Sequence, residues 1–61
     1  MMFTVQLDRE DNSRDYAYIK GNTKPNVISR ITNSVWLKCD ETDFYYNMNK
    51  VVSFQVEEKE E

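Results

Sequence analysis

Phe3 to Lys20 read FTVQLDREDNSRDYAYIK, and these residues set the fold class. Apolar side chains alternate with polar ones at Phe3, Val5 and Leu7, a spacing typical of a strand with one buried face. Residues 16–20, YAYIK, resume an extended pattern after the wholly polar residues 8–15. We therefore expect two strands, joined at 8–15 by a solvated loop or a wide hairpin connection.

More strands are expected further along the chain, each marked by alternation and by β-branched or aromatic residues. They cover residues 35–39, 44–46 and 51–56, with turns at 40–43 and 47–50, and the only Gly and the only Pro fall in a turn at 21–26. Five to six short strands predict an all-β single domain, barrel-like or a strongly twisted antiparallel sheet. The competing architecture is an open antiparallel sheet that dimerises through its edges.

Residues 27–32 are ambiguous. Ile28, Ile31 and Val35 have the i, i+3, i+7 spacing of a helix, and Pro25-Asn26 could begin one. The run is β-branched, however, and only about six residues long before Asn33, which is short for a helix. We expect a strand here, or at most one short helical turn.

Strand alternation divides the apolar residues between two faces. The side chains expected inside are Phe3, Val5, Leu7, Ala17, Ile19, Val35, Leu37, Phe44, Tyr46, Val52, Phe54 and Val56. The same parity turns Cys39 inward, as a small buried apolar residue. It leaves several aromatic and basic side chains on the outer faces of their strands.

The net charge of −3 belongs to the C-terminus, because residues 57–61, EEKEE, carry four acids and one base. Residues 1–56 are neutral, with seven acids and seven bases, and residues 16–39 hold four bases and no acid. We expect a β domain over 1–56 and a frayed acidic tail over 57–61, of which a residue or two could continue the last strand.

Composition argues against several classes of protein. The chain has 61 residues and no His, which removes the commonest general base and metal ligand, and no nucleophile–base pair is recognisable. We expect no enzyme, no metal and no other cofactor. One cysteine, no signal peptide and no membrane-length apolar run favour a cytoplasmic protein. A domain this small, without disulfide or metal, favours a homodimer.

The outward aromatic residues are the features that point to function. The candidate partner-binding residues are Trp36, Tyr45, Tyr16, Tyr18, Lys38 and Lys20. Exposed Trp and Tyr are enriched at protein interfaces, so the first hypothesis is a non-catalytic protein–protein interaction module. The second is weak binding of single-stranded nucleic acid, since small β-barrels stack bases on strand aromatics beside Lys. The third is a purely structural subunit, in which the aromatics only cover the ends of the core.

The overall composition (small, acidic, rich in Asn and Tyr, without His) is similar to that of accessory proteins of bacteriophages and prophages. This resemblance assigns no residue. It implies a small protein that binds and modulates, by inhibition, a protein of the host, in the host cytoplasm.

Overall fold

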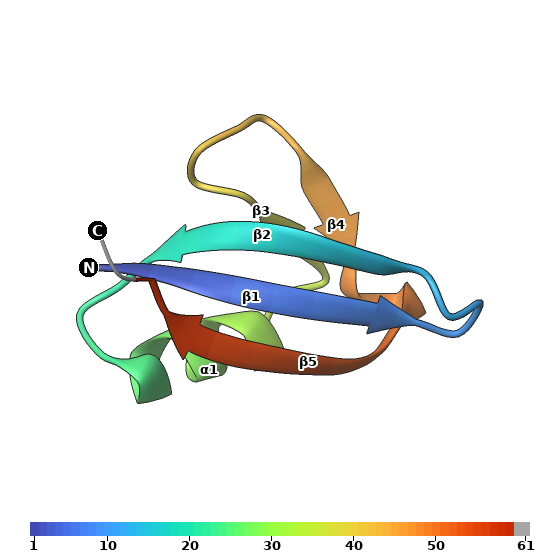
Figure 1. Cartoon of the computed structure of the whole chain (residues 1–61), viewed down its shortest axis with the longest axis horizontal. Helices are drawn as coiled ribbons and strands as arrows, with labels where there is room; N and C mark the ends of the chain where they lie inside the picture. The colour runs from blue at the N-terminus through green and yellow to red at the C-terminus, as the bar shows by residue number, and fades with distance from the viewer. Residues whose placement is uncertain (60–61) are drawn as a thin grey trace.

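The computed structural model describes residues 1–59, which form five strands in two antiparallel sheets, one α-helix and one 3₁₀ helix (Figure 1). In chain order the elements are β1 (Met2–Arg9), β2 (Arg14–Lys20), α1 (Lys24–Thr32), β3 (Trp36–Lys38), β4 (Tyr45–Asn47), η1 (Met48–Lys50) and β5 (Val51–Glu58). The larger sheet has the order β2-β1-β5, and β3 pairs with β4 in the smaller one. The prediction of a small β domain with five to six short strands is confirmed in part, because the domain is mostly β with five strands but also contains a nine-residue helix.

Strand β1 is the centre of the molecule. It pairs antiparallel with β2 on one side and with β5 on the other, so all its ladder positions are used. Its alternate side chains Phe3, Val5 and Leu7 are each 1% exposed or less. The core that they begin is completed by Ala17, Ile19, Val27, Ile31, Leu37, Cys39 and Val56.

The connection between β1 and β2 is tighter than the expected loop over 8–15. Only residues 10–13 lie outside the strands, and Asn12 takes a positive φ of 68°, which Asn tolerates better than most residues. Ion pairs across the hairpin, Arg14–Asp8 at 2.8 Å and Arg9–Asp15, continue the ladder into the polar segment. The polar residues of segment 8–15 that belong to β1 and β2 therefore lie in solvent but still form strand.

The expectation of a strand at residues 27–32 is wrong, and the alternative, one short helical turn, is helical as expected but too short. These residues belong to α1, a nine-residue helix that begins at Lys24, where the Thr23 hydroxyl caps the Asn26 N–H and Pro25 occupies the first turn. The β-branched run is therefore only the second part of the helix. Val27 and Ile31, four residues apart, are its buried residues and pack on the inner face of the larger sheet.

Among residues 1–59 no sheet closes into a barrel, contrary to the barrel-like form of the prediction. The chain after β3 does run along the outer edge of β2, where the Asp40 N–H donates to the Tyr18 carbonyl at 2.8 Å. Side chains then replace backbone acceptors. The Tyr18 N–H meets the Cys39 Sγ at 3.4 Å, and the Lys20 N–H meets the Asp40 carboxylate at 2.8 Å. A side-chain acceptor cannot extend a ladder, so the two sheets stay separate.

Three residues expected inside are exposed instead, namely Val35, Phe44 and Val52, while Tyr46 and Phe54 are half-buried. Strands β3 and β4 are only three residues long, so Val35 and Phe44 lie beyond their ends. Val52 lies at a register shift, because Asp8 pairs with Ser53 while Arg9 pairs with Val51. The extra residue breaks the alternation that the prediction relied on.

The acidic C-terminus begins within the sheet. Glu57 and Glu58 are the last residues of β5, and the Lys59 N–H donates to the Met2 carbonyl at 3.0 Å. Residues 60–61 of the expected tail lie outside the described residues.

The Asp40 carboxylate joins three segments. Besides the Lys20 N–H of β2, it accepts the guanidinium of Arg30 on α1, with both oxygens 3.3 Å from guanidinium nitrogens. Burial raises the pKa of Asp40, but the Lys20 N–H and the Arg30 charge outweigh it and hold that pKa below its ordinary value.

Stability is therefore expected to depend on pH through Asp40. Because its folded pKa is lowered, the stabilisation is present above the ordinary value of 3.8 and is lost as the pH falls through the folded pKa. We expect Asp40→Ala to lower the free energy of unfolding by about 1–2 kcal/mol at pH 7 and to flatten the acid limb of its pH profile. Urea titrations between pH 2 and 7 measure both. Asp43→Ala, in the same loop, is the control, and an equal effect there would refute the assignment.

Gly21 permits close packing of α1 on β2. A Cβ at this position would lie 2.5 Å from the Cγ2 of the buried Val27. Gly21→Ala is therefore expected to destabilise by about 1–3 kcal/mol. In urea unfolding, Gly21→Ala combined with Val27→Ala should cost less than the sum of the two single variants, since the second substitution removes the obstructing methyl group. Simple additivity would show that this contact is not the cause.

Candidate binding surface

The structure separates the six candidate residues into two groups. Trp36, Lys38 and Tyr45 lie on the smaller sheet, and we call these three the aromatic surface. The other three, Tyr16, Tyr18 and Lys20, alternate along β2 with the buried Ala17 and Ile19, and so lie on the outer face of the larger sheet.

The register of β3 and β4 assembles the aromatic surface. Lys38 pairs directly with Tyr45, so their side chains share a face, and Trp36 lies on that face two residues along β3. The intervening Leu37 points the other way and is buried in the core. Trp36 is 59% exposed and Tyr45 58% exposed, although both are large apolar side chains. The hairpin thus holds two aromatic rings in solvent on a backbone anchored through Leu37.

Val35 and Phe44 are further exposed apolar residues of the hairpin that the sequence interpretation missed. They alternate with Trp36 and Tyr45, and so lie on the opposite face, with Leu37 and Tyr46. Both are exposed, and the ring of Phe44 stacks on that of Tyr46 with centroids 6.5 Å apart. The Tyr46 hydroxyl donates to the Tyr16 carbonyl at 3.3 Å, which ties the hairpin to β2. The sequence carried no signal for their exposure, because alternation places both on the face of Leu37 that was expected to be buried.

Tyr18 is less available than its parity suggests. The ammonium of Lys59 lies 4.4 Å from the centroid of its ring, a cation–π contact, and the same ammonium is 3.5 Å from the Glu41 carboxylate. Tyr18 is accordingly half-buried, whereas Tyr16, two residues earlier, is exposed. Of the aromatic residues on β2, Tyr16 is the one open to a partner.

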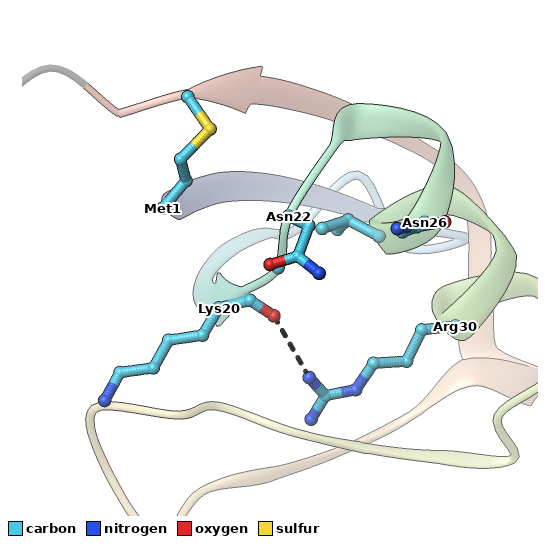
Figure 2. A pocket seen from close by; sticks show the side chains of 7 residues that line it. Met1, Lys20, Asn22, Asn26 and Arg30 are labelled. Atoms are coloured by element: carbon cyan, nitrogen blue, oxygen red, sulfur yellow. Dashed lines mark hydrogen bonds between the residues drawn. The ribbon is translucent and has the colours of Figure 1, made fainter.

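Lys20 borders an open hollow of about 400 Å³ between the end of β2 and α1 (Figure 2). Its walls are Met1, Lys20, Gly21, Asn22, Asn26, Val27 and Arg30. Arg30 donates to the Lys20 carbonyl at 3.4 Å, while the Lys20 side chain extends away from Arg30 (Figure 2). The two cations therefore do not converge on one point, and Arg30 is already paired with Asp40.

Cys39 is buried, as expected, and is the only thiol. Burial raises its pKa, but hydrogen bonds from the Thr42 hydroxyl and from the backbone N–H groups of Tyr18, Glu41 and Thr42 outweigh that effect and lower it. With no histidine in the chain, this thiol has no imidazole to serve as its base.

Residues 1–59 carry neither a metal-binding cluster nor a membrane-spanning helix. No group of three or more Asp, Glu or Cys side chains in this part of the chain is placed to hold a metal ion. None of its helices has the length and apolar character required to cross a membrane.

Comparisons with protein families, with curated proteins and with solved structures found no match to this chain.

Neighbouring residues on opposite faces of β3 should respond differently to truncation. Trp36→Ala is expected to change the free energy of unfolding by no more than about 0.5 kcal/mol, because the ring is mostly in solvent. Leu37→Ala should cost about 2–5 kcal/mol, because it opens a cavity in the core. Urea unfolding followed by far-UV circular dichroism measures both. If Trp36→Ala unfolded the protein, Trp36 would belong to the core and not to a binding surface.

Proposed function

We propose that this protein is a non-catalytic protein–protein interaction module that binds another protein through the aromatic surface and also associates with itself. The observation that carries the proposal is the pair Trp36 and Tyr45, displayed on one face of a hairpin whose opposite face is fixed in the core. Trp and Tyr at a rigid, solvent-exposed position are the usual anchors of protein interfaces.

Energetics supports this reading over a purely structural role. Both rings are more than half exposed, so they add little to the burial that holds the domain together. A partner that covered both rings would remove two large, mostly exposed aromatic side chains from water. Lys38, which pairs with Tyr45, adds a charged group beside the rings, and protein interfaces commonly carry such polar groups at their rim.

Single-stranded nucleic acid is the less favoured partner. Of the four bases in the acid-free segment, Arg30 is paired with Asp40, Lys24 begins α1, and Lys20 lies on the larger sheet. Only Lys38 accompanies Trp36 and Tyr45. One cation beside two rings gives little attraction for phosphates, and the whole chain carries a net charge of −3.

The proposal includes the cellular compartment in which the protein acts. A buried free thiol suits a reducing compartment, and the composition is similar to that of phage accessory proteins. The module would then act in the cytoplasm, in the host cytoplasm if a phage encodes it, by occupying and inhibiting a host protein.

Affinity capture from the source cell with matched variants tests the aromatic surface. We expect the wild type to retain a specific protein, and Trp36→Ser with Tyr45→Ser to reduce its recovery at least tenfold, about 1.4 kcal/mol of binding free energy. Ile28→Ser, an exposed apolar residue on α1, is the control and should retain the partner. The captured protein, once purified, should also shield Trp36 from acrylamide quenching.

Equal recovery by the aromatic double variant and the control would refute the proposal. A titration with a single-stranded oligonucleotide distinguishes the nucleic-acid hypothesis from the proposed function. Binding that weakens steeply with salt and depends on Trp36 would favour the nucleic-acid hypothesis, whereas a flat titration at low salt would remove it.

A further inference from the structure

The two edges of the larger sheet are treated differently. Along β2, the outward backbone groups have partners from other parts of the chain. Tyr18 is bonded at both its N–H and its C=O, through Cys39 and Asp40, and the Tyr16 carbonyl accepts from Tyr46. An edge closed in this way cannot accept a further strand.

The opposite edge, along β5, is open. The Lys59 N–H bonds to the Met2 carbonyl of β1, and in an antiparallel ladder the direction of these groups alternates. The N–H and C=O groups of Phe54, Val56 and Glu58 therefore point away from β1. Within residues 1–59 no hydrogen bond joins them to another element. Figure 1 shows β5 at the border of the sheet, with β1 on one side only.

A groove of about 320 Å³ runs beside the first half of this edge, between the end of α1 and β5. Its apolar walls come from Ile31, Met48, Val51, Val52 and Phe54. Val52 is 61% exposed although it is β-branched and belongs to a strand. An open edge supplies backbone hydrogen bonds to an added strand, and a groove beside it receives alternate side chains of that strand.

We infer that the occupant of this edge is a second copy of the chain, whose β5 pairs antiparallel with this one to give a continuous six-stranded sheet. Charge favours this occupant. Lys50 immediately precedes β5, which ends with Glu57 and Glu58, and Lys50 makes no ion pair within residues 1–59. Antiparallel pairing brings the basic start of each strand towards the acidic end of the other, at two symmetric places.

The side chains also complement one another. A two-fold axis at Gln55 sets Phe54 opposite Val56 of the second copy, and Val56 opposite its Phe54. Aromatic and β-branched residues are a favourable cross-strand pair. The same register joins the outward groups of these residues to each other, so the polar edge of each copy satisfies that of its mate.

This inference rests on the proposed function, which includes self-association. The residues of the dimer interface, however, differ from those of the aromatic surface. Trp36 and Tyr45 belong to β3 and β4, which take no part in the β5 edge. The dimer would therefore present two copies of the aromatic surface. Because edge pairing buries a small area, we expect a weak dimer that dissociates on dilution.

Charge exchange tests the inference. Sedimentation equilibrium should show a monomer–dimer equilibrium for the wild type. Lys50→Glu alone and Glu58→Lys alone should each raise the dissociation constant roughly five- to tenfold, because each places like charges together twice. The double variant, with both exchanges, should restore the wild-type value. Trp36→Ser is the control and should leave the dissociation constant unchanged.

Amide hydrogen exchange, followed by NMR, gives a second readout that involves no substitution. The amides of Phe54, Val56 and Glu58 should exchange slowly at concentrations where the dimer forms and rapidly in the monomer, whereas that of Gln55, bonded to β1, should be protected in both.

A chain that stays monomeric at millimolar concentration would overturn the inference, as would a dimer in which the Phe54 and Val56 amides remain unprotected. Protection of those amides only when a different protein is added would show a foreign strand as the occupant, and would equally overturn it. Loss of the dimer in Trp36→Ser would move the self-association to the aromatic surface. Loss of partner capture with the dimer intact would contradict only the proposed function.

Discussion

Burial of one face of β1 is the constraint on which the rest of the structure depends. A chain of 61 residues can enclose only a small core, and the residues that β1 contributes, Phe3, Val5 and Leu7, lie at its centre. Both neighbouring strands take their register from this one, and α1 closes the face with Val27 and Ile31. The hairpin of β3 and β4 is attached to the same core by Leu37. The surfaces that stay exposed to solvent are those that are not needed to cover this face of β1.

Side chains that replace backbone groups at the edge of β2 explain why the molecule has two sheets. Asp40 and Cys39 occupy positions that a continuing strand would fill, and Arg30 draws α1 to the same carboxylate. The hairpin consequently turns away from the larger sheet and presents Trp36 and Tyr45 to solvent. The same feature that prevents a barrel from closing thus creates the candidate binding surface.

The two edges of the larger sheet connect stability with function. An edge strand whose N–H and C=O groups are already hydrogen-bonded cannot pair with another strand, whereas an edge strand with unpaired groups can. Proteins therefore normally protect both edges of a sheet, or bind a partner at one of them. Here the β2 edge is closed by the chain itself, while β5 carries alternating apolar residues to an open border. An open edge and an exposed aromatic face on different elements suit a small module that makes two kinds of contact.

Much of the fold was accessible from the sequence. Alternation at residues 3–7 predicted β1 and its buried face, and alternation at 51–56 predicted the strand β5 and the buried position of Val56, because a period of two is typical of a strand with one side in the core. The inward position of Cys39 and the outward positions of Trp36 and Tyr45 followed from the same rule. The limits of the rule appear at Val35, Phe44 and Val52, where strands end or a register shift intervenes.

The sequence by itself determined which residues alternate and therefore which faces are apolar, since that information is local. It did not determine the helix at 24–32, because β-branched residues in a short run suit either structure until Val27 and Ile31 find a sheet to pack on. Nor did it determine which edge stays open. That depends on contacts between residues about twenty positions apart, such as Tyr18 with Cys39 and Lys20 with Asp40, and only the tertiary structure brings those residues together.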